Sequence, residues 1–256
     1  MRITVKVGTS TLAHATGRLN IQRMEGLCKV LSDLKNAGHE IILVSSGAIG
    51  MGVGKLGLRK RPKDIPSKQA AAAVGQCELM YTYDKLFSEY HHTVAQLLIT
   101  GDDTTNDTRR LNFTNTLNRL LELGALPVIN ENDTVATDEI VIGDNDTLAA
   151  IVARSVHADM LILLSDIDGL YTADPHTHPE AALLHHVAGI DDHIREIAGI
   201  SSSTQGTGGM VTKLHAADIC LGCGCKMVIA NGNNPGNLYD ILEGKTVGTT
   251  FSEERL

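Results

Sequence analysis

Aromatic residues are scarce in this chain of 256 residues. Tryptophan is absent and aromatic residues make up only 3% of the sequence, whereas hydrophobic residues make up 43%. The core must therefore rest on aliphatic side chains. A chain of this length is ample for a well-packed core, either as one large domain or as two lobes that share a sheet.

Long apolar runs are also lacking. The sequence has no run of eighteen or more apolar residues, and the segment after Met1 reads as a strand rather than a signal peptide. We therefore expect a cytoplasmic protein that does not bind membranes. The net charge of −8 argues against nucleic-acid partners as well, because broad binding to nucleic acid needs a basic surface. An anionic small substrate is not excluded, because a few lysines in a cleft can reverse the local potential.

The chain has five cysteines, an odd number that is typical of reduced thiols rather than disulfides. Three of them, Cys220, Cys223 and Cys225, lie close together in sequence and invite a metal interpretation. No second ligand pair at zinc spacing accompanies them, and the segment reads as the end of a helix that leads into a strand. We therefore predict no metal site built from the chain's own residues.

Strand-like and helix-like segments alternate along the chain. The expected strands are residues 2–8, 40–46, 92–100, 125–133, 158–166 and 225–231, and the segment GTTF lies near the end of the chain. The expected helices are residues 20–38, 67–90, a stretch that ends at Gly124, 145–157, 209–221 and 238–242, and the polar segment 101–107 is expected to be a loop. This alternation predicts an α/β sandwich with a mainly parallel sheet, whose ligands lie beyond the carboxyl ends of the strands.

Lys6 breaks the apolar pattern of the first expected strand. It is opposite in phase to Ile3, Val5 and Val7, and a lysine near the end of a covered sheet needs an anion or a wet cleft. An exposed edge strand would accommodate the same lysine without any function, so the sequence leaves both interpretations open.

Three polar residues, Asp144, Asn145 and Asp146, lie where a helix is expected to begin. One of them is enough to cap the helix. The excess indicates a further role, and a carboxylate near two lysines could hold them in place.

Thr207, Gly208 and Gly209 precede another expected helix, and Lys213 lies one turn inside it. Backbone N–H groups at a helix start bind phosphate with the help of the helix dipole, and this lysine can reach the same anion. The P-loop pattern is not met, because no Gly-Lys-Ser/Thr sequence occurs. We interpret the segment as a phosphate site, and a flexible surface turn with a solvated lysine is the alternative.

The literal pattern G-x-G-x-x-G occurs over residues 52–57. A dinucleotide site needs its first glycine directly after a strand, and an acidic residue at the end of a second strand about twenty residues later. The strand here ends near Ser46 and the later region reads as a helix, so we reject this interpretation. Ser46, Gly47 and Ala48 could instead offer N–H groups and a hydroxyl to a small anion such as a carboxylate.

Seven segments between Val5 and Ala217 together resemble the amino-acid kinase family, in the family's order. They are VKVGTS, VSSGAIGMG, KQAAAAVGQ, VINENDTV, GDNDTLAA, LLSDIDGLYTADP and GTGGMVTKLHAA. Several are similar to the members that phosphorylate the side chain of L-glutamate rather than to the family at large. Many of those members carry a further carboxyl-terminal RNA-binding-like domain, for which this sequence has no counterpart.

The resemblance implies a three-layer α/β/α sandwich with a mainly parallel central sheet, in one amino-acid kinase domain over residues 1–256. Residues 1–158 would form the lobe that binds the amino acid, and residues 159–256 the lobe that binds the nucleotide. The implied substrates are L-glutamate and ATP with Mg²⁺, in the first step of proline biosynthesis. Proline as a feedback inhibitor and a homo-oligomer, either dimer or tetramer, are further expectations.

Carried over position by position, the resemblance also implies the site residues. Lys6 and Lys213 would contact the transferring phosphoryl group, and Asp146 would organise the two lysines. The residues implied for glutamate are Ser46, Asp133 and Asn145. Those implied for ATP are Lys6, Ser165, Asp166, Thr207, Gly208, Gly209, Met210, Val211, Thr212 and Lys213.

The implied chemistry suits these residues. A glutamate side chain is already an anion at pH 7 and needs no general base, and Asp133 favours a free α-ammonium over a blocked amino group. Kinases of acetylglutamate, aspartate, carbamate or a nucleoside monophosphate are the alternatives, but a monophosphate would call for basic residues near positions 130–133, where the sequence shows none. A catalytically inactive amino-acid sensor would be expected to lack Lys6, Asp146 or Lys213.

Overall fold

The computed structural model describes all residues except 15, 17, 136–143, 176, 201–208 and 254–256. The chain forms two compact units: unit 1 comprises Met1–Lys6 and Gly143–Leu256, and unit 2 comprises Val7–Ile142. The two lobes expected on either side of residue 158 are defined by the ligand that each would bind and not by the contacts within each unit. These two lobes stay a prediction.

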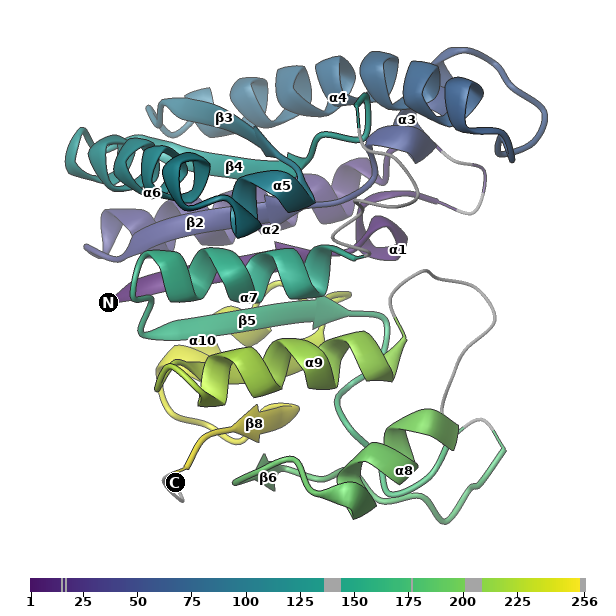
Figure 1. Cartoon of the computed structure of the whole chain (residues 1–256), viewed down its shortest axis with the longest axis vertical. Helices are drawn as coiled ribbons and strands as arrows, with labels where there is room; N and C mark the ends of the chain where they lie inside the picture. The colour runs from purple at the N-terminus through teal and green to yellow at the C-terminus, as the bar shows by residue number, and fades with distance from the viewer. Residues whose placement is uncertain (15, 17, 136–143, 176, 201–208, 254–256) are drawn as a thin grey trace. The chain divides into compact units, whose positions relative to one another are not determined.

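Unit 2 is built on three parallel strands in the order β3-β4-β2. These are β2 (Glu40–Ser45), β3 (Val94–Ile99) and β4 (Leu126–Glu131). The helices are α1 (Thr9–Leu12), α2 (Ile21–Asn36), α3 (Ala48–Lys55), α4 (Ile65–Ser88), α5 (Gly101–Thr105) and α6 (Asp107–Glu122). In Figure 1, α6 covers one face of these strands and α2 the other, so both faces are enclosed by helices.

Unit 1 contains strands in the order β1-β5-β7-β8-β6. These are β1 (Arg2–Val7, with Val7 counted in unit 2), β5 (Met160–Ser165), β6 (His186–Val187), β7 (Lys226–Asn231) and β8 (Thr249–Phe251). Its helices are α7 (Asn145–Ser155), α8 (Asp192–Ile200), α9 (Met210–Leu221) and α10 (Asn237–Leu242). β5 and β7 are parallel, whereas β8 runs antiparallel to β7. Figure 1 shows α7 and α9 on one face and α10 on the other.

The core is aliphatic, as the composition predicts. β2 and β5 carry continuous runs of buried Ile, Leu and Val, which is typical of strands covered on both faces. Tyr83, Phe87 and Phe251 are the aromatic members among the largest fully buried side chains in the described residues. The prediction of an α/β sandwich with a mainly parallel sheet is therefore confirmed.

Most expected elements form, and their ends follow from local chemistry. Asn20 caps α2 by accepting a hydrogen bond from the backbone N–H of Arg23, and Gly38 follows the helix with φ of 92°. The prediction of a loop over residues 101–107 is wrong, because α5 forms there. Its cause is a capping box in which Thr100 and Asp103 each bind the other's backbone N–H.

The first glycine of the rejected dinucleotide pattern, Gly52, has a packing role. Gly52 lies in α3, where an added Cβ would come within 1.8 Å of the carbonyl oxygen of Ala71 in α4. Gly75 of α4 is equally tight, since its Cβ would lie 1.7 Å from the carbonyl oxygen of Ala48. Two helices cross at backbone contact here, which only glycine allows. The segment is thus a helix crossing.

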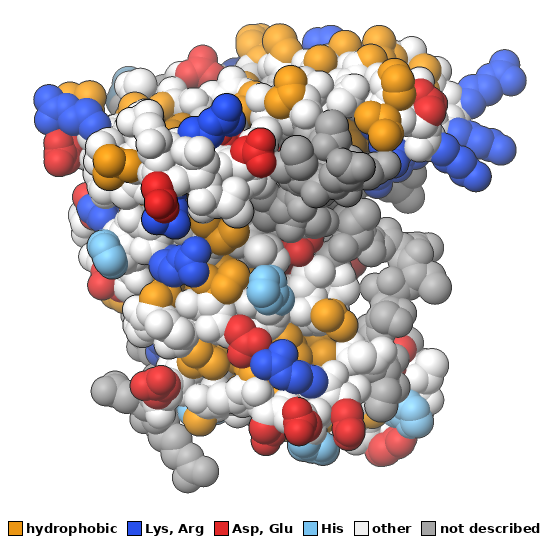
Figure 2. All heavy atoms as spheres, in the orientation of Figure 1, with side chains coloured by type: hydrophobic (Ala, Val, Ile, Leu, Met, Phe, Trp, Pro, Cys, Tyr) orange, Lys and Arg blue, Asp and Glu red, His pale blue; other side chains and the backbone are white. Residues whose placement is uncertain are grey.

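The outer surface includes an apolar strip. Hydrophobic side chains gather over α4 in Figure 2, and Ile65 and Tyr81 of this helix are exposed. None of the described helices combines the length and the hydropathy needed to cross a bilayer.

Candidate functional site

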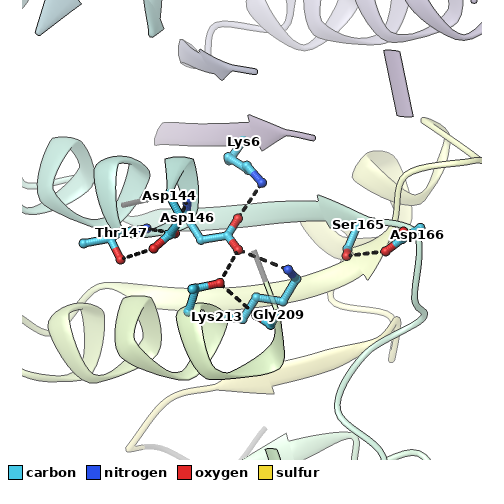
Figure 3. A network of polar contacts seen from close by, with 9 residues as sticks. Lys6, Asp144, Asp146, Thr147, Ser165, Asp166, Gly209 and Lys213 are labelled. Carbon is cyan, nitrogen blue, oxygen red and sulfur yellow. Dashed lines mark hydrogen bonds and ion pairs between the residues drawn. The ribbon is translucent and has the colours of Figure 1, made fainter. Parts of the chain in front are cut away.

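Two lysines and one aspartate form a buried cluster in unit 1 (Figure 3). Lys6 Nζ lies 2.6 Å from Asp146 Oδ1, and Lys213 Nζ lies 3.1 Å from Asp146 Oδ2. The exposed side-chain fractions are 11% for Lys6, 7% for Lys213 and 1% for Asp146. Buried charges of this kind are costly unless they are paired. The three side chains together carry one excess positive charge, so the cluster suits an additional anion.

Asp146 owes its position to the start of α7. Asp144 caps this helix, and its Oδ1 accepts hydrogen bonds from the backbone N–H groups of Asp146 and Thr147, both at 2.8 Å. The Thr147 hydroxyl also donates to Asp144 Oδ2 at 3.0 Å. The prediction that one residue of 144–146 caps the helix is confirmed, and the capping residue is Asp144. Asp146 is left to project its carboxylate toward the lysines.

Lys213 lies in the first turn of α9, as expected, and it is buried rather than solvated. Its neighbour Thr212 was expected to contact the nucleotide. Thr212 Oγ1 lies 3.1 Å from Asp146 Oδ2 and 2.8 Å from the carbonyl oxygen of Gly209. Its contact with the nucleotide stays a prediction. A hydroxyl has one proton, so it donates to one of these oxygens at a time.

The cluster holds the Asp146 carboxylate in its ionised form. Burial raises the pKa of Asp146, but the charges of Lys6 and Lys213 and their hydrogen bonds outweigh burial, so the pKa lies below its ordinary value. An ionised carboxylate can anchor both ammonium groups at once. Each ammonium group then has a fixed position and further N–H bonds with which it can bind an additional anion.

The first turn of α9 has the features of an anion site. Gly209 precedes the helix with extended backbone and has no side chain of its own to cap the first N–H groups of α9. Met210 is buried in the core, whereas Val211 is 57% exposed. Thr207 and Gly208, which the sequence also assigns to ATP, lie outside the described residues.

Ser165 and Asp166 lie at the carboxyl end of β5. The Ser165 hydroxyl donates to Asp166 Oδ1 at 3.2 Å (Figure 3). β7 ends beside them, because Ser165 is in register with Asn231 and its carbonyl oxygen accepts from the N–H of Gly232 at 2.7 Å. Asn231 in turn donates to Asp168 Oδ1 at 2.7 Å. Asn231 is a polar group at this edge that the sequence motifs did not single out as a site residue.

Ser46 and Asp133 belong to unit 2, at the carboxyl ends of β2 and β4. Ser46 donates its backbone N–H to the carbonyl oxygen of Val7 at 3.2 Å, and Gly47 follows with a left-handed φ of 104°. Burial raises the pKa of Asp133, and the charge of Arg61 partly opposes this. Arg61 is thus a cation that acts on Asp133, although the sequence shows no basic residue at positions 130–133. Asn145, the third residue expected for glutamate, is the first residue of α7 in unit 1.

The cysteine cluster lies at the far end of α9. Cys220 and Cys225 are buried, and Cys223 is exposed. Across the described residues, no three His, Cys, Asp or Glu side chains come together as metal ligands would.

The sequence profile of the amino acid kinase family matches residues 1–231 of this chain. Glutamate 5-kinase of Clostridium perfringens (strain 13 / Type A) is 53% identical over 254 residues, which cover 98% of this chain and 94% of the relative. Glutamate 5-kinase of Caldanaerobacter subterraneus subsp. tengcongensis is 53% identical over 251 residues, which cover 98% of this chain and 68% of that longer relative.

Solved structures agree on the fold. Carbamate kinase from Giardia lamblia has a TM-score of 0.69 at 16% identity, covering 99% of this chain and 98% of that one. UMP kinase from Bacillus anthracis has a TM-score of 0.67 at 16% identity, covering 99% and 96% of the two chains. At such low identity these likenesses speak for the fold alone. Together with the matches at half identity, they show that this chain belongs to the amino acid kinase family and, within it, to the glutamate 5-kinases.

Proposed function

We propose that this chain transfers the γ-phosphoryl group of ATP to the side-chain carboxylate of L-glutamate. The products are L-glutamyl 5-phosphate and ADP, and the reaction is the first step of proline biosynthesis. The glutamate 5-kinase relatives support this activity. The observation that carries the mechanism is the sharing of the Asp146 carboxylate by Lys6 and Lys213.

The difficulty of the reaction is electrostatic rather than one of proton transfer. The acceptor carboxyl is ionised at pH 7, so it is already a nucleophile and no general base is required. Its approach to a negatively charged phosphoryl group has to be compensated by positive charge. We assign this role to the ammonium groups of Lys6 and Lys213, with Asp146 as the group that fixes their direction, because phosphoryl transfer depends mainly on positioning and charge stabilisation.

The nucleotide site is proposed around the carboxyl end of β5 and the start of α9. The N–H groups of the first turn of α9 would bind phosphate oxygens beside Lys213. Ser165 and Asp166 would contact the rest of the nucleotide, as would Thr207 and Gly208. The lobe formed by residues 159–256 would thus hold ATP.

Magnesium is best treated as part of the nucleotide substrate. Among the described residues no group of three His, Cys, Asp or Glu side chains gathers, and the Asp146 carboxylate is engaged by two ammonium groups. The groups that the cluster offers to a ligand are therefore ammonium groups, which bind phosphate oxygens and repel a metal cation. We propose that Mg²⁺ enters bound to the phosphates of ATP, where it neutralises charge on the β- and γ-phosphates.

Glutamate is proposed to bind through Ser46, Asp133 and Asn145, within the lobe formed by residues 1–158. A half-buried carboxylate at position 133 would pair with the α-ammonium of a free amino acid. The amide of N-acetylglutamate would offer Asp133 no positive charge, so this carboxylate favours L-glutamate over N-acetylglutamate.

Regulation and assembly follow as further proposals. We propose that proline inhibits the enzyme, as an end product of the pathway. The apolar strip over α4 supports a homo-oligomer, either dimer or tetramer. The acidic net charge of −8 supports an enzyme that does not bind nucleic acid or anionic membranes, and we propose that it is cytoplasmic.

One assay tests the proposed function. ADP release from ATP would be measured in parallel with L-glutamate, L-aspartate, N-acetylglutamate and carbamate as acceptors. We expect L-glutamate alone to support rapid release, and hydroxylamine should trap the acyl phosphate product as a hydroxamate. Faster turnover with any of the other three acceptors would overturn the assignment.

A further inference from the structure

Gln76 is a buried polar residue that no step of the proposed reaction has yet used. It lies in α4 with an exposed fraction of 7%, in unit 2. Its side-chain Oε1 accepts a hydrogen bond from Asn130 Nδ2 at 2.9 Å. Asn130 is itself 2% exposed and lies near the carboxyl end of β4.

A chain of hydrogen bonds fixes which way the Gln76 amide faces. The backbone N–H of Glu131 can only donate, and it donates to one side-chain atom of Asn130 at 2.9 Å. That atom must therefore be Oδ1, so the other one is the donor Nδ2. Because Nδ2 donates to Gln76, the accepting atom of Gln76 must be Oε1. The remaining amide nitrogen, Nε2, is left with both of its N–H bonds.

Gln76 Nε2 has no hydrogen-bond partner within the described part of the chain, although it is shielded from solvent. A buried donor left unpaired destabilises the fold, and native structures rarely retain one without a reason. A ligand that supplies an acceptor at this point would recover that free energy. The amide is held rigidly for such a ligand, because turning it over would break its bond to Asn130.

Gln76 lies among the elements expected to hold the amino acid. Asn130 is three residues before Asp133 on the same strand end. Gly75, the preceding residue, packs so closely on α3 that its Cβ would touch the carbonyl oxygen of Ala48, two residues after Ser46. The amide therefore belongs to the same strand edge of unit 2 as Ser46 and Asp133, two of the three residues expected to bind glutamate.

We propose that Gln76 Nε2 donates a hydrogen bond to the α-carboxylate of L-glutamate, an inference that rests on the proposed function. Glutamate offers two carboxylates, and the γ-carboxylate is consumed by phosphoryl transfer. The α-carboxylate shares its carbon with the α-ammonium that Asp133 is proposed to bind, so donors for the two groups must lie close together. An amide donor and a carboxylate at the same strand edge would match an α-carboxylate and an α-ammonium. Gln76 is thus a specificity residue that distinguishes α-amino acids from simple acids and amines.

The test uses the isosteric substitution Gln76→Glu, which keeps an acceptor for Asn130 and replaces the donor by a negatively charged oxygen. Steady-state kinetics would be measured with L-glutamate and with 4-aminobutyrate, which keeps the amine and the reacting carboxylate and lacks the α-carboxylate. Gln22→Glu is the matched control, because Gln22 is exposed on α2 and the charge change is the same.

We expect kcat/KM for L-glutamate to fall at least about tenfold in Gln76→Glu, with the KM for ATP unchanged. The value for 4-aminobutyrate should change much less, and Gln22→Glu should behave as the wild type. An equal loss for both acceptors, or an unchanged KM for L-glutamate, would overturn the proposal and leave Gln76 as a support for Asn130. If Gln76→Glu does not fold, Gln76→Met removes the donor without adding charge and should show the same selectivity for the α-carboxylate.

The wild-type enzyme separates this inference from the proposed function. No glutamate-dependent ADP release by the wild type would contradict the function itself. Normal release by the wild type with a retained glutamate KM in the variants would contradict only the role of Gln76.

Discussion

The two oxygens of the Asp146 carboxylate each bind a different lysine: Lys6 Nζ lies 2.6 Å from Oδ1 and Lys213 Nζ lies 3.1 Å from Oδ2. The three residues come from β1, the start of α7 and the start of α9, at positions separated by up to 207 residues (213 − 6) in the sequence. A single carboxylate thus sets the direction of two ammonium groups, and both should act on the same phosphoryl group.

Lys213→Ala should reduce kcat by about 10²–10³, because one of the charges that stabilises the transferring phosphoryl group is removed. The affinity for L-glutamate should be largely retained, because this lysine is proposed to act on phosphate. Initial rates of ADP release at saturating substrates measure the effect. Lys29→Ala is a suitable control, since Lys29 is exposed on α2 and should leave kcat unchanged. Phosphoryl transfer at near-normal rate in Lys213→Ala would show that this lysine is wrongly assigned.

Asp146→Asn should lower the free energy of unfolding by about 3–5 kcal/mol at pH 7, because two buried ammonium groups lose their shared anion. The pKa of Asp146 is lowered in the folded protein, so its stabilising contribution is present above the pKa of an unfolded aspartate and is lost as pH falls through the folded value. The difference between wild type and Asp146→Asn should therefore shrink on acidification. Urea unfolding at several pH values measures it, and a difference independent of pH would contradict the ionised state of Asp146.

Thr212→Val should lower kcat by about three- to tenfold while the KM for L-glutamate stays unchanged, because the hydroxyl acts on the Asp146 carboxylate. Valine has nearly the shape of threonine, so packing is preserved. Thr212→Ser keeps the hydroxyl and should restore most of the activity. A nucleotide contact would give a different pattern, in which Thr212→Val raises the KM for ATP and leaves kcat intact.

Two members of the cluster, Lys6 and Asp146, stand out in the sequence because they depart from their local patterns. Lys6 is a charged residue near the end of a mostly apolar strand, and the segment 144–146 contains more polar residues than a helix cap needs. Such excesses point to chemistry because a fold does not otherwise require them. The strands were predictable for the opposite reason, because their apolar runs follow the pattern of a covered sheet.

The contacts that sequence reasoning missed join residues far apart in the chain. Thr212 and Asp146 are 66 positions apart, and Asn130 and Gln76 are 54 positions apart. Neither partner has a local pattern that names the other, and the direction of an amide depends on the whole chain of hydrogen bonds around it. α5 was missed for a different reason, since its capping box compensates for the lack of apolar periodicity that usually signals a helix.

Gly75→Ala should destabilise unit 2 by about 1–3 kcal/mol or more, because its Cβ would lie 1.7 Å from the carbonyl oxygen of Ala48 and the helices α3 and α4 would have to separate. Gly199→Ala is the matched control: Gly199 is also helical, but it is exposed and an added Cβ would meet nothing within 4 Å. That control should be neutral or stabilising by about 0.5–1 kcal/mol, from helix propensity alone. Thermal unfolding compares the two, and equal effects would mean that the close crossing of α3 and α4 does not limit stability.

Asp133→Ala should raise the KM for L-glutamate at least about tenfold with little change in kcat, because the α-ammonium loses its anionic partner. The wild type should show a related effect of pH. Burial raises the pKa of Asp133, so this carboxyl is protonated at a higher pH than an ordinary aspartate, and the glutamate KM should begin to rise earlier on acidification. Arg61 opposes the shift, so Arg61→Gln should move the rise to still higher pH.

The pH profile of the glutamate KM tests the assignment of Asp133 in two ways. In Asp133→Ala the rise at low pH should disappear, because the group that titrates is gone, while the profile for ATP should match the wild type. An apparent glutamate affinity that is unchanged by Asp133→Ala would remove this residue from the amino-acid site. A profile that is insensitive to Arg61→Gln would instead mean that Arg61 does not act on the group that titrates, whatever residue binds the α-ammonium.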